Sequence, residues 1–337
     1  MRPDSLNWKA GAGLLLLSAG AFFLPQIFAP FAGIAFLYLL PGYFLVKILK
    51  VKLQPLESLA ISILASIMVS THAIYWLSLA FGYSAGAFAL FFALVSLSAL
   101  FIGKLPKFQW RNGFMAPVAL AGATCLLVFF VLHFSLWVPS ESGVVVGGWN
   151  YGDYFLHASI IQSVNSGNFP PQEPVYAGTE MRYHWFADFH TAIASKLTGF
   201  FHSFPAAIDS AAGAGLLSLL GYLAAFHFTK DRNASLLCAL LLVFGGGFGY
   251  MRLFGEMQGG SVITLLQNSP FDNDGEFFQL PSMLPGFLLP QRPMAIGLPA
   301  LVAVLLLVAK GYPNDWRRLL LAGIILGMMP PFQYHAF

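Results

Sequence analysis

The chain of 337 residues is 58% hydrophobic, only 9% charged, and carries a formal net charge of +3. Soluble globular domains contain about 25% charged residues, so the composition excludes an ordinary soluble domain and indicates a polytopic membrane protein. The basic residues lie between apolar runs and not along one basic face, which argues against a nucleic-acid partner. Cys125 and Cys238 fall in apolar runs and are expected to be buried thiols, with no disulfide or cysteine metal site.

Several apolar runs approach or exceed the ~20 residues that cross a bilayer as a helix. Bounded by Gly, Pro and charged residues, they predict eight membrane spans and the start of a ninth near residue 318. Because the chain reaches Phe337 inside the ninth run, we expect it to be the front part of a longer protein. The expected fold is all-α, with about nine transmembrane helices. The eight predicted spans are 11–29, 31–49, 56–81, 85–103, 114–137, 205–228, 234–250 and 293–310.

The distribution of Lys and Arg predicts the orientation, because cytoplasmic loops are enriched in these residues. With the N-terminus in the cytoplasm and the chain in the cytoplasmic (inner) membrane, 13 of the 17 basic residues face the cytoplasm. This assignment requires that residues 184–201 do not span. At helical spacing that segment has a polar stripe opposite an apolar one, which predicts a helix lying in the membrane surface. The outer basic residues are then Arg182, Lys196, Arg252 and Arg292.

Two long outer loops follow from this topology, at residues 138–204 and 251–292. They hold nine of the fourteen acidic residues, so titratable chemistry is concentrated on the outer face. Loops of this length are uncommon unless they are functional or disordered, and their Trp, Tyr and Phe content argues against disorder.

The order of segments resembles that of a known superfamily. The predicted span 114–137 is followed by "YGDYFLHASIIQSVNSGNFP", by "RYHWFADFHTAIASKLTGF", by two spans around a short basic turn, and by a second acidic outer loop. This layout resembles the GT-C superfamily of membrane glycosyltransferases, which includes oligosaccharyltransferases and protein mannosyltransferases. The resemblance covers residues 114–337, the start of a GT-C-like core. Residues 1–113 resemble four extra front helices of an uncharacterised bacterial or archaeal branch.

The resemblance implies a bilayer-embedded glycosyltransferase that takes a sugar from a polyprenyl-phosphate donor and passes it to an acceptor outside the membrane. It leaves the sugar, the acceptor and the oligomeric state open. Asp153 stands where the superfamily has its first-loop catalytic carboxylate, a general base or a metal ligand. The alternative is that Asp153 only caps a helix over 154–165. His157 lies four residues later on the same helical face, where it binds metal, orients the Asp153 carboxylate or makes an ordinary hydrogen bond.

The strip that follows supplies candidate substrate contacts. A phosphate-bearing donor needs a cation, and Arg182 is one of few outer candidates; the alternative is a salt bridge to Glu180 or Asp188. His184 and Asp188 share a helical face, as two metal ligands or substrate contacts would, but no third ligand at a diagnostic spacing accompanies them.

The second loop contributes the remaining candidates. Asp272, Asp274 and Glu276 alternate with other residues, and such hard oxygen ligands favour Mg²⁺ or Mn²⁺; the alternative is a solvated acidic turn. Arg252 and Arg292 are candidate clamps for the donor phosphate, or else arginines that anchor span ends at the interface.

Two other functions compete with the enzyme. One is a transporter or lipid-binding membrane protein whose acidic loops gate access, and the other is a GT-C-like scaffold without catalysis. Transporters usually hold ionisable residues within the membrane and show internal repeats. The predicted spans are almost free of charge and no repeat is visible, which favours the enzyme.

Overall fold

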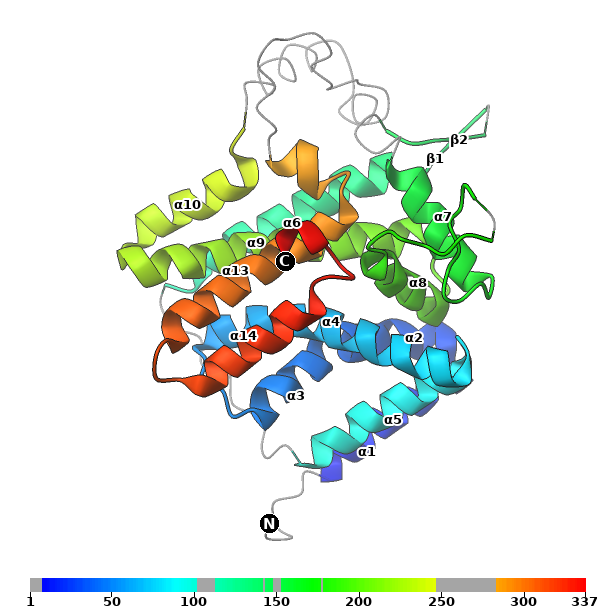
Figure 1. Ribbon diagram of the computed structural model, residues 1–337, viewed down its shortest axis with the longest axis horizontal. Helices are drawn as coiled ribbons and strands as arrows, with labels where there is room; N and C mark the ends of the chain where they lie inside the picture. Colours follow the sequence, from blue (N-terminus) through cyan, green and yellow to red (C-terminus); the bar gives the residue numbers. More distant parts are fainter. Residues whose placement is uncertain (1–7, 102–112, 142, 148–152, 177, 247–282) are drawn as a thin grey trace.

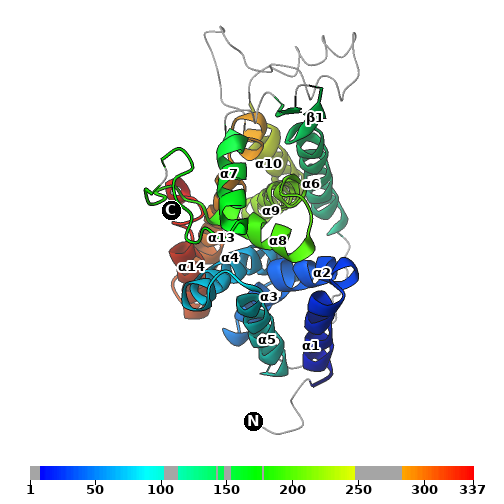
Figure 2. The same ribbon diagram turned by 90° about the vertical axis from the view of Figure 1, so that its right-hand side faces the viewer.

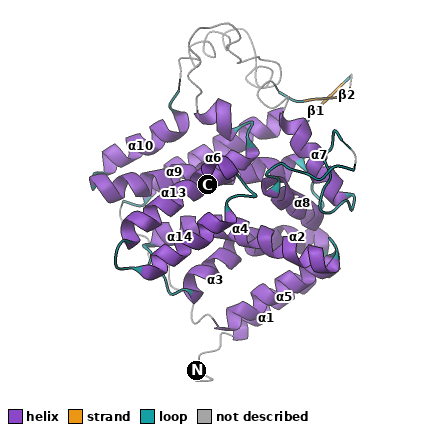
Figure 3. Cartoon of the chain, viewed as in Figure 1, coloured by secondary structure: helices purple, strands orange, loops and turns teal. Residues whose placement is uncertain are grey.

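The computed structural model describes residues 8–101, 113–141, 143–147, 153–176, 178–246 and 283–337. Within these ranges the chain is mostly helical, with one small hairpin (Figures 1 and 3). In chain order the elements are α1 (Trp8–Phe23), α2 (Pro25–Gly33), η2 (Ile34–Leu39), α3 (Leu40–Ile48), α4 (Pro55–Phe81), α5 (Ala85–Phe101), α6 (Met115–Ser135), β1 (Val138–Ser140), β2 (Gly143–Val145), α7 (Asp153–Asn165), α8 (Phe186–Thr198), α9 (Ser203–Thr229), α10 (Arg232–Phe244), η4 (Leu284–Leu288), α13 (Arg292–Gly311), α14 (Trp316–Met328) and η5 (Tyr334–Ala336).

Five helical segments are long and apolar enough to cross a membrane, judged by length and composition. This confirms the prediction of a mostly helical, multi-pass membrane protein. The five are Pro25–Ile48, Pro55–Phe81, Met115–Ser135, Ser203–Thr229 and Arg292–Gly311.

The other predicted spans form shorter helices. Helices α1, α5, α10 and α14 have 16, 17, 13 and 13 residues, less than the ~20 residues of a full span, so the count of nine spans is not confirmed. The predicted break near residue 30 is wrong. The helix breaks at Leu24, because Pro25 opens the next helix, and Pro30 lies inside α2.

The long helices lie roughly side by side, and the molecule has two distinct ends (Figure 1). Helix α9 is central and packs against α6, α10 and α13, while α3 packs on α4 and α14 on α13. Helices α7 and α8 lie across one end, which faces the viewer in Figure 2. We call this the α7–α8 end. The opposite end, where α3, α9 and α13 finish, we call the basic end; it carries Lys47, Lys50, Lys52, Lys230, Arg232 and Lys310.

The helix Pro25–Ile48 is interrupted by a π-helical turn, η2, in which the Leu40 amide donates to the Ala35 carbonyl five residues earlier. Pro41 lacks an N–H, so the Leu37 carbonyl is not used within the helix. The Ser70 hydroxyl of α4 lies 3.3 Å from that carbonyl and 3.2 Å from the Ile67 carbonyl of its own helix, and its one proton is shared between them. The π-turn and the proline together tie this helix to α4.

One hydrophobic core joins the first helices to the later ones. It includes buried side chains of α2, α4 and α5 together with those of α8, α9, α13 and α14, and a second cluster lies between α6, α7 and α9. The predicted domain boundary near residue 113 stays a prediction.

The prediction of buried thiols is wrong, because Cys238 is exposed and Cys125 is half-buried. Cys125 packs against the cluster between α6 and α9, close to Gly215, whereas Cys238 lies on the exposed side of α10.

Helix α8 corrects the prediction of a surface helix with a water-facing polar stripe. Every side chain from Phe186 to Ala194 is buried. The helix packs against α2 and α4, and also against α7, α9 and α13. Its polar residues Asp188, His190 and Thr191 are fully buried, because α7, α9 and α13 supply hydrogen-bonding partners for them.

Candidate functional site

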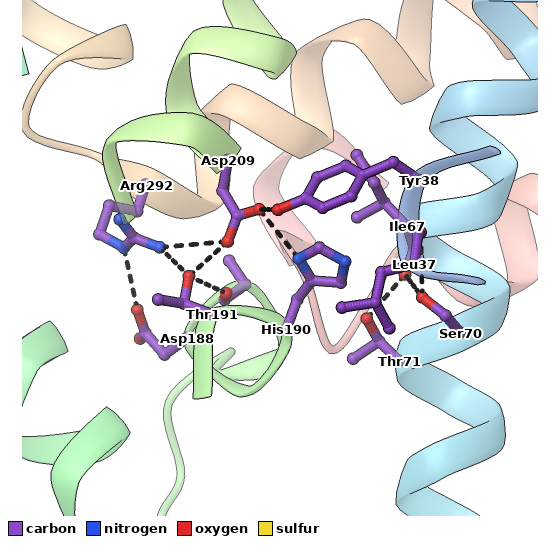
Figure 4. A network of polar contacts seen from close by, with 11 residues as sticks. Leu37, Tyr38, Ile67, Ser70, Thr71, Asp188, His190, Thr191, Asp209 and Arg292 are labelled. Carbon is purple, nitrogen blue, oxygen red and sulfur yellow. Dashed lines mark hydrogen bonds and ion pairs between the residues drawn. The ribbon is translucent and has the colours of Figure 1, made fainter. Parts of the chain in front are cut away.

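A buried ion-pair cluster lies where α8, α9 and α13 meet (Figure 4). Arg292, the first residue of α13, donates from Nε to Asp188 Oδ1 at 3.2 Å, and its Nη2 lies 3.8 Å from Asp209 Oδ2. Its Nη2 also donates to the Thr191 hydroxyl. The three charged side chains are at most 3% exposed. One guanidinium therefore bridges two carboxylates away from solvent.

Two imidazoles and two hydroxyls complete the cluster. His157 Nδ1 lies 2.8 Å from Asp188 Oδ2, and His190 Nδ1 lies 3.0 Å from Asp209 Oδ1. The Thr191 hydroxyl donates to Asp209 Oδ2 and the Tyr38 hydroxyl donates to Asp209 Oδ1, each at 2.5 Å. The resulting central polar network joins η2, α7, α8, α9 and α13 and consists of Tyr38, His157, Asp188, His190, Thr191, Asp209 and Arg292.

A backbone contact between α9 and α13 fixes the geometry of this network. A Cβ atom on Gly213 would lie only 1.9 Å from the Ala295 carbonyl oxygen, so the two helices touch through their main chains. Asp209 precedes Gly213 by one turn, and Arg292 precedes Ala295 by three residues. Because α9 and α13 run in the same direction, the contact brings the carboxylate and the guanidinium together.

Asp153 lies at the edge of the network. It is the first residue of α7, is half-buried, and accepts a hydrogen bond from Gln291 Nε2 at 3.2 Å. Tyr183 is close to both Asp153 and the network: its ring packs on His157, with 5.9 Å between centroids, and the Asp153 charge acts on its hydroxyl. Burial raises the pKa of the Tyr183 hydroxyl, and the charges of Asp188 and Asp153 raise it further. This hydroxyl therefore stays protonated near two carboxylates.

Two further histidines are held neutral. Burial, together with the neighbouring imidazoles of His335 and His157, lowers the pKa of His184 to about 4. Burial and the Arg292 charge lower the pKa of His202 to about 4. His184 stacks on Tyr183 at 4.1 Å between ring centroids. At neutral pH both imidazoles are hydrogen-bonding groups without charge.

The structure brings together Asp153, His157, His184, Asp188 and Arg292, which come from three separate parts of the sequence. Three details differ from the predictions. His157 bonds Asp188 and does not orient the Asp153 carboxylate. Asp153 begins α7 one residue before the predicted helix, and the hydrogen bond that it accepts comes from Gln291. Arg292 is buried between carboxylates, so it is not an interfacial anchor, and both carboxylates already engage its charge.

Arg182 lies apart from the network and is exposed. The alternative for Arg182, a salt bridge to Glu180 or Asp188, is wrong, since neither carboxylate, both of which the structure describes, lies within ion-pairing distance. The remaining predicted residues, Arg252, Asp272, Asp274 and Glu276, lie outside the described residues.

Asp209, Thr191, Tyr38 and Gln291 were not predicted as site residues. Asp209 had a clear signal, because it is an acidic residue inside a predicted span, and such residues are rarely without a role. The expectation that the spans are almost free of charge overlooked it. Tyr38 had no comparable signal, since its direction depends on the π-turn η2.

The described residues contain no group of three or more His, Cys, Asp or Glu side chains that could hold a metal ion. The predicted Mg²⁺ or Mn²⁺ depends on the acidic residues of the second loop, outside the described ranges, and stays a prediction.

No family model, curated protein or solved structure matches the chain.

Proposed function

We propose that the protein is a membrane glycosyltransferase that transfers a sugar from a polyprenyl-phosphate-type donor to an acceptor hydroxyl at the α7–α8 end. In the predicted orientation this end faces outward from the cytoplasmic membrane. The resemblance to the GT-C superfamily supplies the reaction class.

The observation that carries the proposal is the position of Asp153. It is a half-buried carboxylate at the end of an apolar bundle, and Gln291 holds it in place. Asp188 and Asp209 are buried and hydrogen-bonded inside the protein, whereas Asp153 is partly exposed. A general base must lie within hydrogen-bonding distance of the proton that it removes, and in this proposal the acceptor hydroxyl binds at that distance from Asp153.

In the proposed reaction, the Asp153 carboxylate takes the proton of the acceptor hydroxyl while the acceptor oxygen attacks the anomeric carbon of the donor sugar. The bond between that carbon and the phosphate oxygen breaks, and its electron pair leaves with the lipid phosphate. The Tyr183 hydroxyl, which stays protonated, donates a hydrogen bond to the sugar. The exposed Arg182 meets the phosphate charge from the water side.

The central polar network has a positioning role in this proposal. It fixes the start of α7 through His157, the start of α13 through Arg292, and α8 between them. Asp153 and Gln291 stand at the starts of these same two helices. Correct placement of a base is worth a large part of its catalytic effect, so a rigid network beneath Asp153 favours catalysis.

The test uses the full chain in proteoliposomes with a panel of polyprenyl phosphates that carry single hexoses or pentoses. Release of lipid phosphate is measured by mass spectrometry, with water and short sugar alcohols as acceptors. Asp153→Asn is expected to lower turnover by about 10²- to 10⁴-fold while folding is retained, because Asn has nearly the same size and capping ability.

The matched control is Glu180→Gln, which removes an exposed carboxylate of the same loop and is expected to change turnover by less than about twofold. Turnover of Asp153→Asn within about threefold of the unaltered chain would contradict the assignment of the base. A folded chain that turns over none of the donors would contradict the donor class.

A transporter is the second candidate, and Asp209 favours it. This carboxylate lies within a membrane-length helix, about 9 Å along the axis from Ser203 at 1.5 Å per residue, and Tyr38 of another such helix donates to it. Intramembrane carboxylates of this kind occur in proton relays. Proton uptake into proteoliposomes that depends on Asp209 and not on Asp153 would favour transport over glycosyl transfer.

A further inference from the structure

A cavity of about 470 Å³ opens at the basic end, where the connection between α3 and α4 meets the turn between α13 and α14. Its charged lining consists of four cations and one carboxylate, and aromatic side chains complete the wall. The residues that matter here are Lys50, Lys52, Lys310, Asp315, Trp316 and Arg317.

Most of the positive charge in this cavity is not neutralised by the protein. Glu57, which is buried, pairs with Lys310. Asp315 caps α14 by accepting from the Arg318 amide at 3.2 Å, and its other oxygen lies 3.6 Å from Arg318 Nε. Throughout the described ranges, no carboxylate lies within ion-pairing distance of the remaining cations, Lys50, Lys52 and Arg317.

The cavity is held in shape by Arg318. Its guanidinium donates to the carbonyl of Lys52 on one side and to the carbonyl of Lys310 on the other, the second at 3.2 Å. These two hydrogen bonds join segments more than 250 residues apart. A site whose walls are already fixed loses less conformational freedom when a ligand binds.

The aromatic residues place the cavity at the boundary between lipid and water. Trp316 is 62% exposed and Tyr312 is 76% exposed, and such residues are enriched at membrane interfaces. The Arg317 guanidinium lies 5.5 Å from the centre of the Trp316 ring, within the range of a cation–π contact. Two membrane-length helices, Pro25–Ile48 and Arg292–Gly311, end beside the cavity.

We propose that this cavity binds a phosphate group, either in the headgroup of an anionic lipid or in a soluble phosphate. A ligand with a single carboxylate would neutralise only one of the three unpaired cations, Lys50, Lys52 and Arg317. A phosphate has more oxygens and more charge, and it can accept from the guanidinium and both ammonium groups. Basic pockets between membrane helices bind anionic headgroups in this way. The proposal concerns the end opposite Asp153 and does not depend on the proposed glycosyl transfer.

The experiment titrates the full chain in uncharged detergent with dioctanoyl phosphatidylglycerol, dioctanoyl phosphatidylcholine or inorganic phosphate. Binding is followed by tryptophan fluorescence. The chain has seven Trp, so the Trp316 signal is the part that disappears in a Trp316→Phe variant. The double variant Lys50→Gln/Lys52→Gln is expected to weaken binding by about 10- to 30-fold.

The matched control is Lys47→Gln/Lys230→Gln, which removes two positive charges from the same end but outside the cavity, and it is expected to change affinity by less than twofold. A lysine-dependent signal with phosphatidylglycerol alone identifies the lipid headgroup, and the same signal with inorganic phosphate identifies a soluble ligand. The proposal is overturned if phosphatidylcholine binds equally well, if both double variants lose the same affinity, or if neither phosphate probe changes the Trp316 signal.

Discussion

Replacement of Arg292 by Met tests whether the central polar network holds the bundle together. The side chain is 3% exposed and lies between two carboxylates that are themselves buried. Removal of one partner from a buried ion pair costs about 3–5 kcal/mol, because the remaining charge is left unpaired in a medium that solvates it poorly. Arg292→Met leaves two buried carboxylates without their guanidinium, with only the imidazoles of His157 and His190 and neutral hydroxyls as partners, so we expect the free energy of unfolding to fall by about 3 kcal/mol.

Neutralising the carboxylates separates charge from packing. The triple variant Asp188→Asn/Asp209→Asn/Arg292→Met has no unpaired charge, although the single amide oxygen at position 209 replaces two carboxylate oxygens that accept separately from Thr191 and Tyr38. Because replacing a complete buried ion pair is often nearly neutral, we expect the triple variant to regain at least half of the lost stability.

The assay is equilibrium unfolding in mixed detergent micelles, followed by tryptophan fluorescence. Arg182→Met, at an exposed site, serves as the control and is expected to change the free energy of unfolding by less than about 0.5 kcal/mol. The reasoning is refuted if Arg292→Met costs less than about 1 kcal/mol, or if the triple variant is no more stable than the single one.

Three further predictions follow from the same structure. Gly213→Ala is expected to cost about 1–3 kcal/mol of unfolding free energy in the same micelle assay, because the new methyl group meets a backbone carbonyl of α13; a stability equal to that of the unaltered chain would contradict the close contact. The pKa values of His184 and His202 are about 4 in the folded state, against an ordinary histidine value of 6.5. Between these pH values the unfolded chain binds more protons than the folded chain, so stability decreases as pH falls from about 6.5 toward 4. His202→Gln should flatten this dependence of stability on pH, and an unchanged slope would argue against it. In a cysteine-free background, a membrane-impermeant maleimide added from outside intact cells should label Tyr176→Cys and not Asn314→Cys, and the reverse pattern would invert the orientation.

The sequence was sufficient to predict most helices, because apolar runs and their breakers are local features. The helices α4, α6, α9 and α13 begin and end within a few residues of the predicted spans. The count of nine spans is not confirmed, since segments such as α10 and α14 are apolar but too short to cross a bilayer. The length of an apolar run in the sequence does not give the length of the helix, because the turn that ends the helix can lie inside the run.

The types of several site residues were predicted from the sequence, but the contacts between them were not. His157 and Asp188 were recognised by residue type and helical spacing, but their pairing with each other depends on how α7 crosses α8. Arg292 was seen at a span boundary, and its burial depends on the contact between α9 and α13 at Gly213. These are relations between distant segments, which local periodicity does not contain.

The π-turn at Ile34–Leu39 has a consequence for comparing this chain with others. A π-turn amounts to one additional residue in an α-helix, and each α-helical residue advances the register by about 100°. Residues before 34 and after 39 therefore follow two different angular phases, and a single helical wheel drawn through Pro25–Ile48 assigns one half to the wrong face. Loss of one codon between Gly33 and Tyr38 would restore a continuous α-helix, keep the apolar composition, and rotate Tyr38 away from Asp209 relative to the preceding helix. A change in length by one residue would thus uncouple the front helices from the buried carboxylate without altering any of the residues that make the contact.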